Sequence, residues 1–255
     1  GASISYGFQG YMADFRITKG YPRYLYNFTA PTAAFQLFYQ AAATPSSDPY
    51  FENVTMLLPG NGTNGAQNNT FLDSSTNAFT ITRNGNTTQG TFTPFSKDAG
   101  GWGNYFDGTG DYITATSNAA YQFGTGDFTI EMWLYTTGYN GVGAKVFQYA
   151  TDGNFSSGGY GADMSSTTAF RFYPPGATPT ISTTLPANEW VHVAVVRSSS
   201  TTKIYVNGIS SASASDSGDY NYGGTYPFAV GSGRNGSGNY DNGYLGYISN
   251  FRVVK

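Results

Sequence analysis

The chain has 255 residues, a net charge of −3, no cysteine, and only 11% charged residues. Its Lys and Arg residues are scattered, which excludes the basic surface that nucleic acid binding requires, and the lack of Cys excludes disulfides and thiolate metal sites. No apolar run is long enough to span a membrane. The abundant Gly, Ser, Thr and Asn residues, with 17% aromatic residues, predict short strands joined by many tight turns.

The first predicted element is a strand in residues 1–19, because "GYMADFRITK" (residues 10–19) nearly copies "GYISNFRVVK" (residues 246–255). Five positions are identical, and the other five exchange similar residues. The offset, 246 − 10 = 236 residues, is too long for a solenoid repeat and fits one large all-β domain. We therefore predict that residues 1–19 are the closing strand of a preceding repeat.

Two alternatives remain open for this strand. In the first, it pairs in cis with an available sheet edge or hangs free. In the second, it occupies the closing position of another domain in trans, as in strand donation, so that chains self-associate.

Residues 20–49 are predicted to be an irregular, Pro-containing linker, and residues 50–255 the main domain. In that domain "FTIEMWLY" alternates with period two, placing Phe128, Ile130, Met132 and Leu134 on one face. Both faces of "EWVHVAVVR" are largely apolar, which predicts a central strand covered on both sides. "TKIYVNGISSAS" predicts a hairpin closed by Asn207-Gly208.

Five ordered blocks of sequence carry a resemblance: "YFDGTGDYITA" (105–115), "FGTGDFTIEMWLY" (123–135), "NEWVHVAVVR" (188–197), "KIYVNG" (203–208) and "GYISNFRVV" (246–254). Together they resemble a laminin G-like, concanavalin A-like lectin/glucanase domain, as found in bacteriophage tail and other virion proteins and in bacterial surface proteins. The resemblance implies an all-β fold, a two-sheet antiparallel jelly-roll sandwich. It also implies a virion or extracellular location.

The residues give no signature of an enzyme. Glycoside hydrolysis needs two carboxylates across a cleft, whereas the strand "FTIEMWLY" offers Glu131 alone. A glycosidase becomes plausible only if Glu131 faces another carboxylate in a cleft. The single histidine, His192, lies within a strand and is interpreted as a buried, hydrogen-bonded residue.

Carboxylates beside Gly-rich turns indicate calcium as a possible cofactor, because Ca²⁺ prefers oxygen ligands from irregular loops. The alternative is that each Asp caps its own turn. Turn capping is the favoured interpretation at each position, because no EF-hand-like spacing is present; the resemblance to laminin G-like domains, which often hold calcium at loop edges, keeps the calcium interpretation open. The candidate ligands are Asp73, Asp107, Asp111 and Asp127.

Three segments mix aromatic rings with Asn, Asp or Arg, the combination that binds a sugar by stacking and hydrogen bonding. All three are predicted to be long loops at the ends of the sandwich. The candidate residues are Trp102, Asn104 and Tyr105; Tyr220, Asn221, Tyr222 and Tyr226; and Arg234, Asn235, Asn239, Tyr240 and Asp241.

The predicted function is a non-enzymatic recognition or adhesion module of a phage virion protein that binds host cell-surface glycan through these loops. In an array, weak single sites gain by multivalency. The alternative is a structural or decoration domain that assembles with neighbouring copies or other virion proteins and has no sugar site. Neither nucleic acid nor membrane is an expected partner.

Overall fold

The computed structural model describes residues 48, 50–60, 70–95, 102–141, 143–151, 155, 158–176, 181–235 and 237–255. The predicted strand in residues 1–19 and the predicted linker, apart from Asp48, lie outside these residues. The unit that contains all described residues runs from Asp48 to Lys255.

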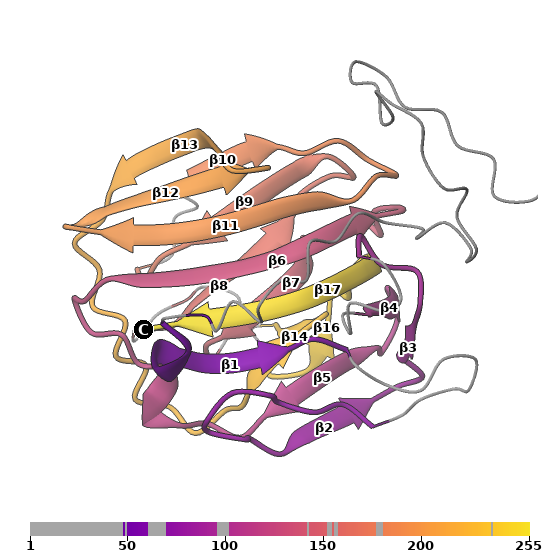
Figure 1. Ribbon diagram of the computed structural model, residues 1–255, viewed down its shortest axis with the longest axis horizontal. Helices are drawn as coiled ribbons and strands as arrows, with labels where there is room; N and C mark the ends of the chain where they lie inside the picture. The colour runs from indigo at the N-terminus through magenta and orange to yellow at the C-terminus, as the bar shows by residue number, and fades with distance from the viewer. Residues whose placement is uncertain are drawn as a thin grey trace, which may run out of the picture. The chain divides into compact units, whose positions relative to one another are not determined.

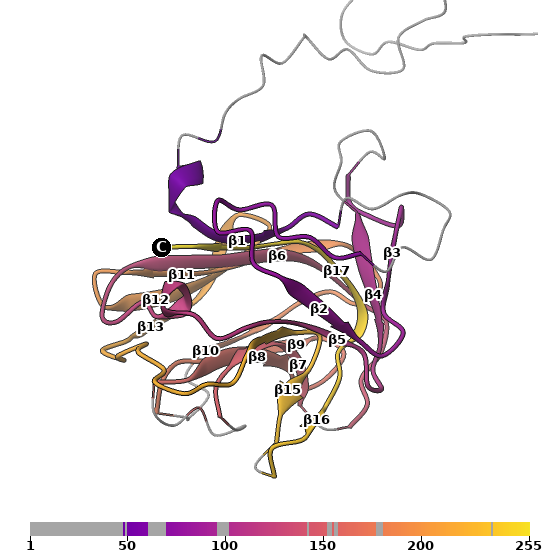
Figure 2. The same cartoon turned by 90° about the horizontal axis from the view of Figure 1, so that it is seen from below.

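Two antiparallel sheets form a sandwich (Figures 1 and 2). The eight-stranded sheet has the order β13 (Ile209–Ser215), β12 (Thr201–Val206), β11 (Val191–Ser198), β6 (Phe128–Thr136), β17 (Leu245–Val254), β4 (Gly103–Asp107) and β3 (Thr88–Gly90), with β1 (Val54–Leu58) also paired to β17. The seven-stranded sheet has the order β10 (Ile181–Thr184), β9 (Ala169–Tyr173), β8 (Tyr160–Met164), β7 (Ala144–Tyr149), β14 (Phe228–Val230), β5 (Tyr112–Ala115) and β2 (Ile81–Asn84). The predicted fold class is confirmed.

Three short elements complete the described part of the chain. A separate hairpin consists of β15 (Gly233–Arg234) and β16 (Tyr240–Asp241). The short 3-10 helices η1 (Phe51–Asn53) and η3 (Ala119–Tyr121) precede β1 and β6. No described helix has the length and apolar character needed to cross a membrane.

Strand β6 confirms the period-two prediction. Its residues alternate between buried and half-buried along the whole strand, and Ile130 and Met132 are fully buried. Side chains on a strand point alternately to its two faces, so this pattern places one face in the core and the other on the outside of the sheet.

Strand β11 lies between β6 and β12, as expected for a central strand. The prediction that both of its faces are covered holds only in part. Val193 and Val195 are fully buried, and on the opposite face Ala194 is buried, whereas His192 and Val196 are only half-buried.

The hairpin between β12 and β13 confirms the turn prediction. Asn207 (φ 50°) and Gly208 (φ 79°) both take positive φ values, as a two-residue type I′ turn requires. Asn and Gly enter this region at low cost, so the local sequence fixes the register of the two strands.

The core between the sheets is rich in aromatic residues. Rings from the seven-stranded sheet, such as Phe147 and Phe172, pack with Phe251 of β17 and Phe128 of β6. Each of these side chains is at most 3% exposed. At roughly 1.5–3 kcal/mol per fully buried large apolar side chain, this core is the main source of the stability of the sandwich.

Candidate functional site

The turn of the β15–β16 hairpin is specified by its own sequence, "RNGSGNYD". The Asn235 side-chain carbonyl accepts a hydrogen bond from the backbone N–H of Ser237 (2.9 Å), and Gly238 takes a positive φ of 82°. Asn and Gly favour such tight turns because Asn bonds its own backbone and Gly tolerates positive φ. The turn therefore holds Arg234 and Tyr240 opposite each other on paired strands.

Hydrogen bonds fix this hairpin to β7, on the side of the seven-stranded sheet that faces away from the other sheet (Figure 2). The Gln148 side chain accepts from the backbone N–H of Arg234 and donates to its carbonyl oxygen (3.3 Å). The backbone N–H of Lys145 donates to the carbonyl oxygen of Asn242 (2.8 Å). The hairpin is thus held at both of its strands.

Aromatic rings and a guanidinium group gather at this hairpin. The guanidinium carbon of Arg234 lies 3.7 Å from the centre of the Tyr226 ring and 5.4 Å from that of Tyr240. The Tyr240 ring stacks on Tyr112 of β5, with ring centres 4.2 Å apart and planes 17° apart. We call Tyr112, Tyr226, Arg234 and Tyr240 the Arg234 cluster. All four side chains are half-buried.

The Arg234 cluster has unused hydrogen-bonding capacity. The Arg234 Nε and the Tyr240 hydroxyl are buried and have no hydrogen-bond partner among the described residues. Burial raises the pKa of Tyr240, although a hydrogen-bonding approach of Arg234 to the hydroxyl and the positive charge of Arg234 act in the opposite direction, so the hydroxyl keeps its proton at neutral pH. The cluster thus combines stacking surfaces with two buried polar atoms that make no hydrogen bond of good geometry to the described residues and that lie close to each other.

The structure brings together predicted residues from two of the three candidate segments. Tyr226 comes from the loop before β14, and Arg234, Asn239, Tyr240 and Asp241 come from the hairpin. The Asn239 side chain makes no hydrogen bond to the described part of the chain, whereas Asp241 accepts one from the Asn235 side chain and braces the hairpin. The Asn239 side chain can therefore form hydrogen bonds with a ligand, whereas one carboxylate oxygen of Asp241 is already used by Asn235 within the hairpin.

Sequence reasoning missed Tyr112. Its signal was present, because Tyr112 alternates with the inward-facing Ile113 in "DYITA" and so points outward from β5. Its position beside Tyr240 follows only from tertiary packing.

The candidate segment with Trp102, Asn104 and Tyr105 does not form a long loop. Asn104 and Tyr105 lie in β4 of the eight-stranded sheet. Trp102 is 7% exposed and Asn104 is 2% exposed, and Asn104 pairs with the core residue Ile248. These two residues were predicted to meet a ligand from solvent, and burial makes that prediction wrong. Tyr105 points outward and packs on Tyr247 (4.9 Å between ring centres).

The prediction is also wrong for Tyr220 and Tyr222, which are fully buried. The Tyr220 hydroxyl donates to Asp216 (2.7 Å), and the Tyr222 hydroxyl pairs with Thr151 (2.9 Å). Both tyrosines are core residues with satisfied hydroxyl groups. Asn221, between them, is exposed, and its side chain lies beside Gly124.

All four predicted calcium ligands accept hydrogen bonds from backbone N–H groups, but only Asp73 and Asp107 cap their own turns, whereas the backbone donor to Asp127 is Ser199, in the turn between β11 and β12. Asp107 and Asp111 share one turn, and the Asp107 N–H donates to the Asp111 carboxylate (3.1 Å). Within the described ranges, no three His, Cys, Asp or Glu side chains group closely enough to hold a metal ion. Calcium binding stays a prediction. The donors are Leu57, Ser75 and Phe79 to Asp73; Thr109 to Asp107; Asn86 and Asp107 to Asp111; and Ser199 to Asp127.

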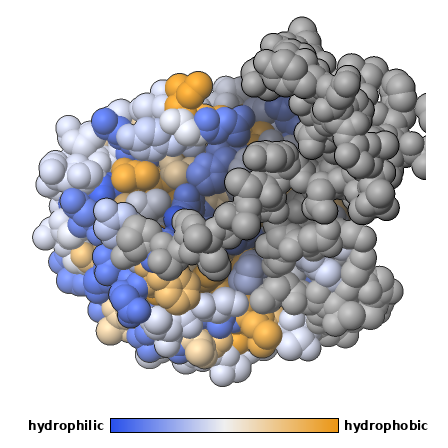
Figure 3. Space-filling model, viewed as in Figure 1, coloured by the Kyte–Doolittle hydropathy of each residue, from blue (hydrophilic) through white to orange (hydrophobic). Residues whose placement is uncertain are grey.

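A second aromatic group lies on the outer face of the eight-stranded sheet. The part of this face that Figure 3 leaves uncovered mixes apolar and hydrophilic patches. Phe92, from the segment after β3, packs its ring over Tyr135, Trp190 and Tyr247 at centre distances of 4.7–5.5 Å. Phe92 is itself 46% exposed and the three rings that it contacts are half-buried, so this sheet-face group is an aromatic surface that stays partly open to solvent.

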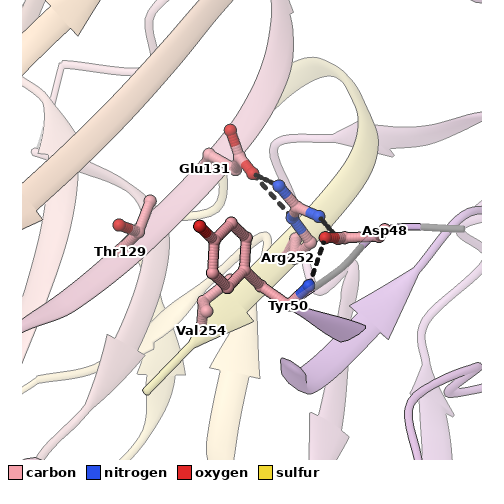
Figure 4. A pocket seen from close by; sticks show the side chains of 6 residues that line it. All are labelled: Asp48, Tyr50, Thr129, Glu131, Arg252 and Val254. Carbon is pink, nitrogen blue, oxygen red and sulfur yellow. Dashed lines mark hydrogen bonds and ion pairs between the residues drawn. The ribbon is translucent and has the colours of Figure 1, made fainter. Parts of the chain in front are cut away.

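The same outer face carries a pocket of about 260 Å³ (Figure 4). Arg252 of β17 lies in it between two carboxylates: its Nε donates to Glu131 (2.6 Å) and its Nη1 donates to Asp48 (2.6 Å). The pocket is lined by Asp48, Tyr50, Thr129, Glu131, Arg252 and Val254.

Glu131 shares this pocket with a second carboxylate, Asp48, which is one requirement for a glycosidase, but the chemistry of the pair opposes that role. The hydrogen bond with His192 (3.1 Å) lowers the pKa of Glu131, burial acts in the opposite direction, and Arg252 lowers it further. A glycosidase acid must keep its proton near neutral pH, which requires a raised pKa. Arg252 also occupies both carboxylates, so neither is free to act as a base.

The lowered pKa of Glu131 predicts an acid-sensitive contribution to stability. Because the folded-state pKa lies below the unfolded value, the contribution is fully present above the unfolded pKa and is lost as pH falls through the folded pKa. We expect Glu131→Gln to lower the free energy of unfolding at pH 7 by about 1–2 kcal/mol. The gap to the wild type should close below about pH 4.

Urea unfolding of both proteins across a pH series measures this gap. Glu189→Gln, at an exposed position, is the matched control and should leave the free energy of unfolding unchanged at every pH. A Glu131→Gln gap of constant size into strong acid would contradict the argument.

Comparison with known proteins gives one family and several structures. The family model described as "Concanavalin A-like lectin/glucanases superfamily" matches residues 107–255, which is more than half of the chain. A comparison with curated proteins gives no match.

Among solved structures, domain 4 of an extracellular arabinanase from Geobacillus stearothermophilus, in complex with arabinotriose, is similar with a TM-score of 0.54 and 17% identity, over 80% of this chain and 92% of that one. The binding domain of Paraclostridial Mosquitocidal Protein 1 has a TM-score of 0.56 and 14% identity, over 80% of this chain and 49% of that one. A third structure is described as "Cell entry of botulinum neurotoxin type C is dependent upon interaction with two ganglioside molecules". It is similar with a TM-score of 0.52 and 14% identity, over 80% of this chain and 48% of that one. The chain thus spans about half the length of the two toxin structures, and at these identities the likeness is one of fold.

Proposed function

Because the chain belongs to the concanavalin A-like lectin/glucanases superfamily, we propose that it is a non-catalytic carbohydrate-binding module whose sugar site is the Arg234 cluster. The observation that carries the proposal is the arrangement at Arg234. A guanidinium group stacked on Tyr226 lies beside the stacked Tyr112 and Tyr240 rings, and two buried polar atoms in this cluster lack partners among the described residues.

This arrangement suits the chemistry of a sugar. A pyranose or furanose ring has apolar C–H faces that pack on aromatic rings, and its hydroxyl groups need directional donors and acceptors. Tyr226 and Tyr240 supply ring surface, the Arg234 guanidinium and the Tyr240 hydroxyl supply donors, and Asn239 supplies both a donor and an acceptor. The anchored hairpin holds these groups before a ligand arrives, which lowers the entropic cost of binding.

The names of similar structures support a carbohydrate ligand. The arabinanase domain was solved with arabinotriose, and the neurotoxin structure is described by its interaction with gangliosides. The lowered pKa of Glu131 supports a module that binds without hydrolysis.

The biological setting is also part of the proposal. We place the module in an extracellular virion protein that recognises host cell-surface glycan, on the basis of the resemblance to phage domains. One site of this size binds weakly, and repetition along an array raises the avidity without any new contact.

The experiment is a glycan array screen of the full chain, followed by calorimetric titration of the best glycan. We expect Tyr226→Ala and Arg234→Ala each to weaken binding at least about tenfold, which corresponds to about 1.4 kcal/mol. Tyr247→Ala, on the outer face of the other sheet, is the matched control and should bind as the wild type does.

Two outcomes would contradict the proposal in different ways. Glycan binding that all three variants retain would place the sugar site elsewhere in the chain. A wild-type chain that binds no glycan on a broad array would remove the carbohydrate function itself.

A further inference from the structure

Strand β17 lies near the middle of the eight-stranded sheet and pairs with three other strands (Figure 1). It pairs with β6 along one side and with both β4 and β1 along the other. Its Ile248, Phe251 and Val253 side chains are fully buried. A segment that occupies this position must satisfy three strands and the core at once.

Two backbone positions in β17 restrict the residue type. Gly246 has a φ of 144°, and a Cβ atom there would lie 2.1 Å from the carbonyl oxygen of Tyr135, so only glycine fits without a shift of backbone. Asn250 takes a φ of 51° at the irregularity in the β17–β6 register, a conformation that Asn and Asp tolerate better than most residues.

One charged position is also specific. Arg252 is the residue that joins Glu131 of β6 to Asp48 before η1 (Figure 4). Its place in β17 therefore connects the middle of the sheet to the start of the domain.

The sequence of residues 10–19 meets each of these demands in order. Gly10 corresponds to Gly246, and Asp14 corresponds to Asn250. Phe15, Arg16 and Ile17 correspond to Phe251, Arg252 and Val253, followed by Lys19 for Lys255. A strand with general β-propensity would match the apolar alternation, but not the glycine, the left-handed residue and the arginine at the same spacing.

We propose that residues 10–19 are a second β17: they close the eight-stranded sheet of a neighbouring domain of this same fold whose own β17 position is open. The partner domain is defined by an unoccupied β17 position, here called the slot, between its β6 and its β4 and β1 strands. Carboxylates at the positions of Glu131 and Asp48 would pair with Arg16, as they pair with Arg252 in this domain. The domain that carries residues 10–19 has its own slot filled by residues 246–255, so the segment acts on a neighbour and links domains in series.

The test uses the full chain, destabilises the native β17 by substitution, and measures whether residues 10–19 replace it. Phe251→Asp places a charge in the core and disfavours the native β17, whereas Phe15→Asp disables the second copy. We expect Phe15→Asp alone to melt as the wild type does, Phe251→Asp alone to keep a cooperative thermal transition and to increase in mass by light scattering, and the double variant to lose the transition.

A milder pair keeps the proposal testable if Phe251→Asp does not fold. In a Phe251→Ala background, Phe15→Ala should lower the melting temperature further, although Phe15→Ala has no effect in the wild type. Equal melting of Phe251→Ala with and without Phe15→Ala would overturn the proposal, and so would a Phe251→Asp chain that stays folded when Phe15→Asp is added. A loss of glycan binding through the Arg234 cluster would leave these results unchanged, so the two proposals fail separately.

Discussion

Replacing Arg197 with Met is expected to lower the free energy of unfolding by about 3–5 kcal/mol, because it leaves a buried carboxylate without its cation. Arg197 is 1% exposed, and its Nε lies 3.5 Å from the carboxylate of Asp216. Its guanidinium also donates to the carbonyl oxygens of Gly126 (2.7 Å) and Asp216 (2.9 Å). These bonds join β11 to the loop before β6 and to the loop after β13.

Chemical unfolding of Arg197→Met and of the wild type measures this loss. Lys203→Met is the matched control, because Lys203 lies on the adjacent strand β12 and is exposed, so its removal should change stability by less than about 0.5 kcal/mol. A similar small change for Arg197→Met would show that the ion pair and its bonds are replaceable, against the argument from burial.

Replacing Asp163 with Asn is expected to lower the free energy of unfolding by about 3 kcal/mol. Asp163 of β8 is 1% exposed and accepts hydrogen bonds from Lys145 (2.8 Å), Arg171 (2.8 Å through Nε) and Tyr173 (3.0 Å). The Lys145 side chain is only 9% exposed. The neutral amide leaves that ammonium group buried without a counter-charge, which is costly in a poorly hydrated site.

The second arm of this test is the double variant with Lys145→Met. If the loss comes from an unpaired ammonium group, removing that group should restore part of the stability that Asp163→Asn costs. Asp219→Asn, at an exposed position, is the control for the loss of one negative charge. A double variant that is less stable than Asp163→Asn alone would locate the cost in packing instead of charge.

These two clusters show why the strongest polar interactions were not predictable from the sequence. Arg197 and Asp216 are separated by a whole hairpin, and Lys145 meets Asp163 only because β7 and β8 pair in one register. Charged residues in strand sequences usually point to solvent, so nothing local marks these as buried. The same holds for Arg252, whose two carboxylate partners come from positions 48 and 131.

In the candidate site, too, features set by neighbouring residues differ from features set by tertiary packing. The segment with Arg234 and Tyr240 was predicted to be a long loop and instead forms the β15–β16 hairpin, although its turn depends on local residues, because Asn235 and Gly238 act on their own backbone. The error at Trp102 and Tyr222 arose because aromatic residues near Gly and Asn look alike whether they cap a loop or fill a core. In a chain with 22 Tyr residues, burial is decided by packing between sheets, not by neighbours in sequence.

By itself, the sequence determined the features that depend on neighbours along the chain. These are the all-β class, the alternation in β6, the Asn207-Gly208 turn and the near identity of residues 10–19 and 246–255. Only the tertiary structure decided which strands lie side by side, and hence that Tyr112 stacks on Tyr240 and that Gly246 touches the backbone of β6. The physical reason is that backbone conformation is set by local sterics and hydrogen bonds, whereas a site requires contacts between strands that are distant in the chain, and those contacts are set by the packing of the whole core.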